Sequence, residues 1–149
     1  TFKKKIFWND LIESHFSEFN LAYGRLDYST EILFVGGKVN CYGDTLLTEE
    51  YPRLIFNCIF NIKNKKEFLK KFSISKKLDQ NSVSLNIEGS LNLLNEKVSF
   101  KRINFNTNYT AQEEELSFFK KTFEKVLFNQ GFFNIFKKEK VKEFILEVI

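Results

Sequence analysis

Apolar and polar side chains alternate along much of the segment from Arg53 to Asn106, and this two-residue rhythm predicts β-strands. In the stretch RLIFNCIFNI, every second residue is apolar, so one side of an extended chain is continuously apolar. Ile55 and Ile59 add apolar positions on the other side. We therefore expect a strand whose main apolar side needs cover or a ligand. That side consists of Leu54, Phe56, Cys58, Phe60 and Ile62.

A β-hairpin is predicted between Val83 and Phe105. The apolar residues keep one parity up to Leu93, residues 94–97 make the reversal, and the parity changes at Lys101–Arg102. One extra residue there, a β-bulge, places both apolar pairs of the return strand on one face. The hairpin then presents Val83, Leu85, Ile87, Leu91 and Leu93, followed by Val98, Phe100, Ile103 and Phe105.

The N-terminal part reads as a helix followed by two strands. Asn9 or Asp10 can cap a helix to about Phe19, because apolar residues recur there at helical spacing. Strands are expected at 21–28 and 31–42, with turns at 28–30 and at Gly43–Asp44. The pair Gly36–Gly37 predicts a bulge or bend inside the second strand. The helical stripe consists of Leu11, Ile12, His15, Phe16 and Phe19.

Three later segments have the spacing of amphipathic helices. Asn64 and Glu67 frame the start of a short helix that ends near Ser73. A capping box at Thr110 and Glu113 opens a longer helix that ends at Gly131, and a last helix starts at about Phe133. Their inward stripes are Phe68, Leu69 and Phe72, then Leu116, Phe119, Phe123 and Val126, then Val141, Phe144, Ile145 and Val148.

These elements predict an α+β protein: an antiparallel, twisted or curved β-sheet with a short inserted helix and two C-terminal helices packed on or beyond one end. With 149 residues we expect one domain. It comprises a helical lead-in (about 1–20), the sheet (21–107) with the short helix near 64–73, and the C-terminal helices (111–149). The chain begins with Thr and has no Met, so we expect an excerpt of a longer protein. Charged residues interrupt every apolar run before it reaches the roughly 18 residues that cross a bilayer.

Composition and charge narrow the function classes. The formal charge of +4 is modest, and the lysines read as spread over helix faces and loops. No RNA-recognition or zinc-finger pattern accompanies them, so we expect no nucleic-acid partner. Cys41 and Cys58 both fall in predicted strands. We expect two buried free thiols, while a single bridge between them stays open.

The sequence contains no pattern that predicts catalysis. His15 is the only histidine and lies on an apolar stripe, so we interpret it as a structural residue. The acidic run Glu113–Glu115 sits at a predicted helix start, where the helix dipole favours negative charge. There is no phosphate-binding glycine loop and no metal-ligand spacing. We therefore expect a protein that is not an enzyme and that needs no cofactor or metal.

Three segments together resemble the carboxyl-terminal region of AsmA-like bacterial envelope proteins. They are GGKVNCYGDTLLTEEYPRLIFNCIFNIKNKKEFLKKFSISKK, then SVSLNIEGSLNLLNEKVSFKRINFN, then LSFFKKTFEKVLFN. The resemblance lies in the order of a strand, a Phe-rich helix with FSISKK, a hairpin and closing helices, and it covers Gly36–Ile149. It implies a parent protein anchored in the inner membrane by a segment outside this chain, with its bulk in the periplasm.

The family is similar to bridge-like lipid-transfer proteins, so the resemblance implies phospholipid transport or outer-membrane biogenesis through a curved, apolar β-sheet groove. Acyl chains need only a continuous apolar surface, which requires no catalytic residue. The residues themselves leave two interpretations of one set open: a lipid-facing surface for phospholipid acyl chains, or a dry core under the C-terminal helices. The set is Leu54, Phe56, Phe60, Val83, Leu85, Ile87, Val98 and Phe100.

A third interpretation is a protein-interaction or structural module. The last predicted helix would dock onto a partner, such as another envelope protein, through Phe144, Ile145 and Val148. The residues alone leave a cytoplasmic location open as well.

Overall fold

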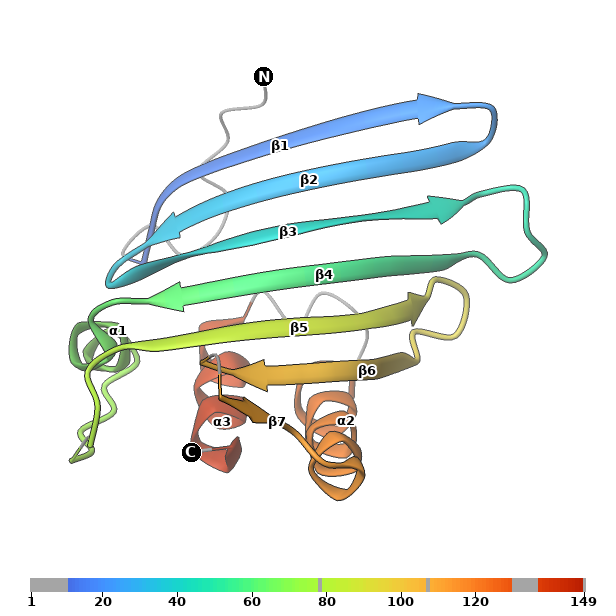
Figure 1. Cartoon of the computed structure of the whole chain (residues 1–149). Coiled ribbons are helices and arrows are strands. Elements are labelled where there is room, and N and C mark those ends of the chain that lie inside the picture. The colour runs from blue at the N-terminus through green and yellow to red at the C-terminus, as the bar shows by residue number, and fades with distance from the viewer. Residues whose placement is uncertain (1–10, 78, 107, 130–136, 149) are drawn as a thin grey trace.

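The computed structural model describes residues 11–77, 79–106, 108–129 and 137–148. Within them, seven strands form one antiparallel sheet in which each strand lies beside its neighbours in the chain (Figure 1). The strands are β1 (Ile12–Ala22), β2 (Arg25–Phe34), β3 (Gly37–Leu46), β4 (Arg53–Ile62), β5 (Val83–Asn92), β6 (Val98–Phe105) and β7 (Tyr109–Thr110). The helices are α1 (Lys65–Lys71), α2 (Glu113–Leu127) and α3 (Lys138–Val148). The predicted α+β class, with a curved antiparallel sheet and C-terminal helices, is confirmed.

The segment predicted as an N-terminal helix is a strand, so the expected helical lead-in is wrong for residues 12–20. β1 pairs with β2 along its length, but the register shifts between Ile12 and Ser14. This irregularity interrupts the alternation at the start of the strand, and the apolar spacing therefore looks helical. Pairing with β2 overrides that local signal. The cap predicted at 9–10 lies outside the described residues.

The strand limits predicted for residues 21–42 are also wrong, because the turns lie elsewhere. Tyr23 and Gly24 have φ values of 51° and 75° and form a two-residue turn between β1 and β2. Gly36, with φ 89°, lies in the turn between β2 and β3 rather than in a bulge. The turns predicted at 28–30 and at Gly43–Asp44 are strand interior. A tyrosine in the first position of the first turn conceals the usual Asn-Gly signal.

The predicted hairpin of β5 and β6 is confirmed, and so is its bulge. The register between the two strands shifts by one residue, which leaves Lys101 as the extra residue between Phe100 and Arg102. Lys101 and Arg102 are exposed. Phe100 and Phe105 both contact phenyl rings of α2, so the bulge brings the two halves of β6 onto one face.

Helix α1 begins as predicted. The side-chain oxygen of Asn64 accepts a hydrogen bond from the Glu67 backbone N–H (3.1 Å), and the Asn64 amide donates to the Glu67 carboxylate (3.0 Å). Leu69 and Phe72 are buried at 3% and 2% exposure. The short helix is therefore held by its cap at one end and by its apolar side chains along its inner face.

Helix α2 begins two residues later than predicted. Gln112, not Thr110, is its N-cap, and the Glu115 carboxylate accepts a hydrogen bond from the Gln112 N–H (2.8 Å). Thr110 stays extended because it pairs in β7 opposite Asn104, to which its hydroxyl donates (2.9 Å). The helix ends at Leu127, with Phe128 as its C-cap, so the end predicted at Gly131 is too late. The predicted start of the last helix at 133 lies outside the described residues.

The cap of α2 predicts a measurable pH effect. The Tyr109 hydroxyl donates to Glu115 (2.6 Å), and this bond, with the Gln112 N–H second, lowers the pKa of Glu115. A carboxylate with a lowered pKa in the folded protein stabilises it above the unfolded pKa, and this contribution is lost as pH falls through the folded pKa. Replacing Tyr109 with Phe should raise the pKa of Glu115 towards its ordinary value, as followed by carboxyl-carbon NMR titration.

The control for this prediction is Tyr51→Phe, which removes an exposed hydroxyl far along the chain from α2. It should leave the Glu115 titration unchanged. An unchanged Glu115 pKa in the Tyr109 variant would contradict the assignment of that hydrogen bond as the main cause.

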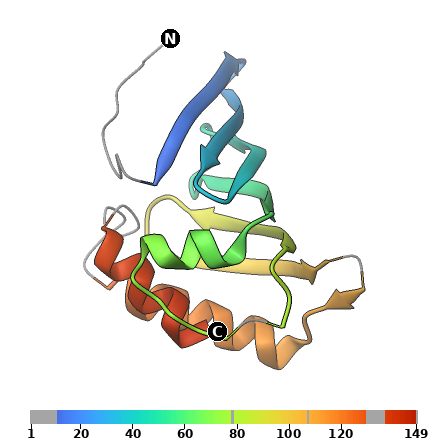
Figure 2. The same cartoon turned by 90° about the vertical axis from the view of Figure 1, so that its left-hand side faces the viewer.

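All three helices lie on one side of the sheet, as their contacts with apolar side chains of the strands establish (Figure 2). A buried cluster forms where β2 ends, β3 begins and α1 packs: Leu11, Phe34, Val39, Leu69, Phe72 and Ile74. Val141 and Ile145 of α3 pack against this cluster. α2 packs against β6, while much of β1–β3 extends away from the helices (Figure 1). The helices therefore cover only part of their side of the sheet.

Candidate functional site

The strand register divides the sheet into two chemically distinct faces. Residues directly opposite one another in adjacent strands share a face, so each row of partners can be followed across the sheet. One row comprises His15, Ile32, Val39, Phe60, Leu85 and Phe105, and the next comprises Ser17, Thr30, Cys41, Cys58, Ile87 and Ile103. We call the side that holds these rows the apolar face; it also holds Phe19, Leu21, Leu26, Tyr28, Phe56 and Phe100.

The opposite side, which we call the polar face, is built mainly of Ser, Asn and charged residues. The Ser84 hydroxyl of β5 donates a hydrogen bond to the Asn61 side chain of the adjacent strand β4 (3.0 Å). Lateral ion pairs join Arg102 to Glu88 (3.9 Å) and Lys38 to Glu31 (3.7 Å). Ile55 and Ile59 are apolar exceptions on this side, as the alternation in β4 predicted. Phe16, Leu33 and Leu46 are further apolar residues on it. Its polar and charged side chains keep most of this face hydrated.

The helices cover the apolar face unevenly. Phe123 of α2 packs edge-to-face on Phe100 of β6, with ring centroids 5.6 Å apart, and Phe119 lies 6.1 Å from Phe105. Phe144 of α3 in turn packs on Phe123 at 5.8 Å. These contacts form a ladder of aromatic rings over β6. This ladder does not cover the apolar face of the strands farther from β6.

Seven of the eight residues predicted as lipid-facing or core are only partly buried in this chain. The exception is Val98, at 2% exposure. Phe56 contacts Phe100 with ring centroids 6.3 Å apart, so part of the set forms one connected surface. Partial burial means that this surface is not sealed from solvent. The partly buried members are Leu54, Phe56, Phe60, Val83, Leu85, Ile87 and Phe100.

The most exposed part of the apolar face lies on β1, which sequence reasoning assigned to a helix. Phe19 is 67% exposed and Leu21 is 64% exposed. They lie opposite Tyr28 and Leu26 of β2, which are partly buried. The two-residue spacing from His15 to Leu21 is the sequence signal that could have placed Phe19 and Leu21 on a strand. The register shift near residue 13 separates this spacing from Leu11 and Ile12. These residues extend the apolar face to an edge strand.

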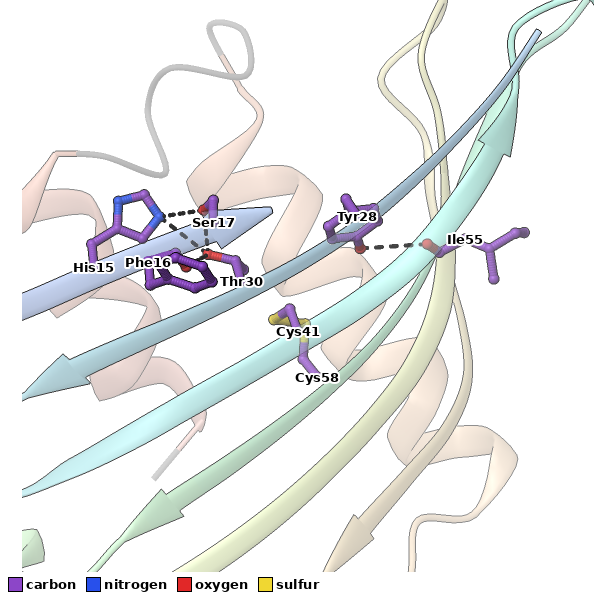
Figure 3. Close-up of a disulfide and its surroundings, with 8 residues drawn as sticks. All are labelled: His15, Phe16, Ser17, Tyr28, Thr30, Cys41, Ile55 and Cys58. Carbon is purple, nitrogen blue, oxygen red and sulfur yellow. Dashed lines mark hydrogen bonds between the residues drawn. A yellow bond between two sulfur atoms is a disulfide. The ribbon is translucent and has the colours of Figure 1, made fainter. Parts of the chain in front are cut away.

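A disulfide and a polar cluster interrupt this face (Figure 3). Cys41 of β3 and Cys58 of β4 lie directly opposite each other and are bridged, so the expectation of free thiols is wrong. Opposed strand positions bring the two side chains to the same face, which the sequence alone did not establish. The Cα atoms of the pair are 4.1 Å apart. The bridge ties the outer strands of the sheet to those that carry the helices.

His15 belongs to the polar cluster beside this bridge (Figure 3). Its Nε2 atom lies 2.7 Å from Ser17 Oγ and 3.1 Å from Thr30 Oγ1, and the Thr30 hydroxyl donates to the Phe16 carbonyl (3.0 Å). His15 is exposed on β1 rather than inward on a helix. Within the described ranges, no carboxylate hydrogen-bonds to its ring and no group of three or more metal-binding side chains forms. The cluster therefore reads as strand-pairing polar contacts.

Of the three residues predicted to dock a partner, two pack on other parts of the chain. Phe144 packs on Phe123, and Ile145 packs against the buried cluster at α1. Val148 is partly buried. Leu146, which was not predicted, is the exposed apolar residue of α3 at 54%.

Tyr28 spans the boundary between covered and uncovered strands. Its hydroxyl donates to the Ile55 carbonyl of β4 (3.4 Å), passing over Gly43, its partner on β3 (Figure 3). Burial, followed by the charge of Asp44, raises the pKa of Tyr28, so the phenol keeps the proton that it donates.

Comparisons with protein-family models, with curated proteins and with solved structures give no match. None of the helices in the described ranges has the length and apolar character needed to cross a membrane.

Proposed function

We propose that this chain is a non-enzymatic segment of an AsmA-like envelope protein and contributes an apolar β-sheet surface to phospholipid transport or outer-membrane biogenesis. The family assignment rests on the resemblance of the segments from Gly36 onward. The observation that carries the functional part is the incomplete cover of the apolar face. Seven of the eight predicted residues are partly buried, and β1 adds two well-exposed apolar side chains.

The dimensions of the sheet suit an acyl chain. A strand of ten residues is about 33 Å long, whereas one leaflet contributes about half of the roughly 30 Å hydrocarbon core of a bilayer. An acyl chain laid on the apolar face would remove apolar surface from water on both partners, at about 25 cal/mol per Å². The polar face would stay hydrated. Binding lipid on one face and water on the other requires no reacting group, in keeping with the expected absence of catalysis.

The proposal includes a location. The parent protein would be anchored in the inner membrane by a segment outside this chain, and this part would lie on the periplasmic side of the cell envelope. The Cys41–Cys58 bridge is compatible with an oxidising compartment. Phospholipid acyl chains are the proposed ligands, and other envelope proteins are the proposed partners.

The test uses two phenylalanines on opposite faces of one strand. Phe19 lies on the apolar face at 67% exposure, and Phe16 lies on the polar face at 59%. Because both are exposed, neither Phe19→Asp nor Phe16→Asp should unfold the sheet. We expect Phe19→Asp to reduce bound phospholipid several-fold and Phe16→Asp to leave it unchanged. Lipid is measured by mass spectrometry of organic extracts after gentle purification and after reloading from detergent-solubilised phospholipid.

Three outcomes would count against the proposal. Wild-type protein that is free of lipid after both procedures would overturn it. Equal loss of lipid in the two variants would show that binding does not discriminate between the faces. Unchanged lipid content in Phe19→Asp would exclude β1 from the binding surface. Circular dichroism of each variant confirms that the fold is kept.

A further inference from the structure

The lysines of this chain are not evenly spread. Residues 63–81 contain seven lysines and two carboxylates, a formal charge of +5, whereas the whole chain carries +4. The rest of the chain is therefore net negative by one. The expectation of dispersed lysines is wrong for this segment, which comprises α1 and its flanking loops. The lysines are Lys63, Lys65, Lys66, Lys70, Lys71, Lys76 and Lys77.

The fold places this charge at one end of the apolar face. α1 follows directly after β4, whose last residue on that face is Ile62, and the segment ends just before Val83, the first residue of β5. Ile62 and Val83 lie opposite each other in the register. The lysine-rich end therefore adjoins the two central strands of the sheet where their apolar side chains begin.

Two adjacent surface hollows join the lysines to the end of the apolar face. The larger, of about 450 Å³, is lined by Lys65, Lys76 and Lys77 together with Asp79 and Val83. The smaller, of about 290 Å³, is lined by Lys38 and Lys63 together with Ile62 and Val83. Val83 lines both hollows, which places ammonium groups and an apolar side chain around one space. That pairing matches an amphiphile with a negatively charged head.

Hydrogen bonds fix the walls of these hollows. The Asn81 carbonyl accepts from the Lys65 N–H (2.7 Å), and the Asn81 side chain accepts from the Lys66 N–H (3.2 Å). On the other side, Ser84 and Asn106 exchange bonds: the Ser84 N–H donates to the Asn106 side chain (3.0 Å), and the Asn106 N–H donates to the Ser84 carbonyl (2.6 Å). The backbone at Lys65 and Lys66 is thus held in place before any ligand arrives.

We propose that the lysine-rich end, residues 63–77 with Lys38, docks the sheet onto a bilayer surface through the headgroups of anionic phospholipids. Seven lysines distributed over a helix and two loops match a surface of many charges better than one small anion. Glu67, Asp79 and Glu31 offset part of this charge, and Glu31 pairs with Lys38 at 3.7 Å. Docking at this end would bring the end of the apolar face to the bilayer surface. This inference rests on the proposed lipid function and adds the part of the sheet that contacts the membrane.

The experiment measures co-flotation of the whole chain with vesicles of phosphatidylcholine alone or of phosphatidylcholine mixed with phosphatidylglycerol. We expect binding to the mixed vesicles only, weakening as salt rises because exposed charges are screened. The triple variant Lys65→Gln, Lys76→Gln, Lys77→Gln should bind about a hundredfold more weakly, since each lysine near an anionic surface contributes about fivefold.

The matched control removes the same charge elsewhere: Lys97→Gln, Lys101→Gln, Lys121→Gln, all exposed and outside both hollows. It should keep most of the binding, and thermal melts should show both triples folded. Equal loss in the two triples, equal binding to neutral vesicles, or abolition of binding by inorganic phosphate at constant ionic strength would each overturn the docking surface.

The two proposals can fail separately. Wild-type protein that floats with anionic vesicles but never takes up lipid from detergent would refute the proposed function and leave docking intact. Wild-type protein that takes up lipid from detergent but does not float would refute docking alone.

Discussion

Replacing Phe72 with Ala should lower the free energy of unfolding by about 3–5 kcal/mol, the range measured when buried aromatic side chains are truncated in well-packed cores. Phe72 ends α1 at 2% exposure and packs edge-to-face on Phe68, with ring centroids 5.3 Å apart. Phe68 in turn packs on Phe34 of β2 at 5.2 Å. Removing the ring of Phe72 leaves a cavity between the helix and the sheet, and chemical denaturation followed by circular dichroism measures the loss.

Phe118→Ala is the matched control for this prediction. Phe118 also lies on a helix but is 48% exposed, so its truncation should change stability by less than about 1 kcal/mol. Similar losses in the two variants would contradict the assignment of Phe72 to the core. Because α1 carries the lysine-rich end, local loosening of α1 in the Phe72 variant should also increase hydrogen exchange at Lys65–Lys71.

The sequence predicted the second half of the fold well because its signals are local. β4 and the β5–β6 hairpin keep a clean two-residue rhythm, and the parity change at Lys101–Arg102 correctly indicated a bulge. The α1 cap was found because Asn64 and Glu67 have the side chains that a capping box requires. In these segments propensity, pattern and tertiary pairing agree.

The first half was mispredicted because its signals conflict. The irregular register near Ile12 conceals the alternation of β1, and the Tyr23–Gly24 turn lacks the usual residues. β1 becomes a strand only because β2 pairs with it, which is information that no local window contains. The same error concealed Phe19, which turned out to be the most exposed phenylalanine on the apolar face among the described residues.

The alternation of apolar residues also could not predict whether helices cover the eight predicted apolar residues. Alternation assigns a residue to a face, but cover depends on where α2 and α3 pack, and that depends on contacts such as Phe123 with Phe100. The bridge between Cys41 and Cys58 is similar, because it requires the β3–β4 register. For these residues the face was predictable from the alternation, whereas the cover of the apolar face and the bridge needed the three-dimensional arrangement.

Loss of the Cys41–Cys58 bridge should lower the free energy of unfolding by about 3 kcal/mol, the magnitude expected when a cross-link closing a loop of this length is removed. The two cysteines are separated by 17 positions. The bridge reinforces a short strand pairing, because β3 and β4 pair only from Gly37 to Tyr42. At Gly43, an added Cβ would meet the Ile55 carbonyl oxygen, so no larger residue can reinforce the junction there.

The double variant Cys41→Ala, Cys58→Ala tests this prediction by urea denaturation with and without reductant. Reductant should lower the midpoint of the wild-type protein towards that of the double variant and should not change the variant itself. Hydrogen exchange should increase first at the β3–β4 ladder, because this short ladder joins the open strands β1–β3 to the strands under the helices. A wild-type midpoint that is insensitive to reductant, under conditions in which mass spectrometry confirms reduction, would contradict a stabilising bridge and leave the joining of the two halves to the backbone ladder alone.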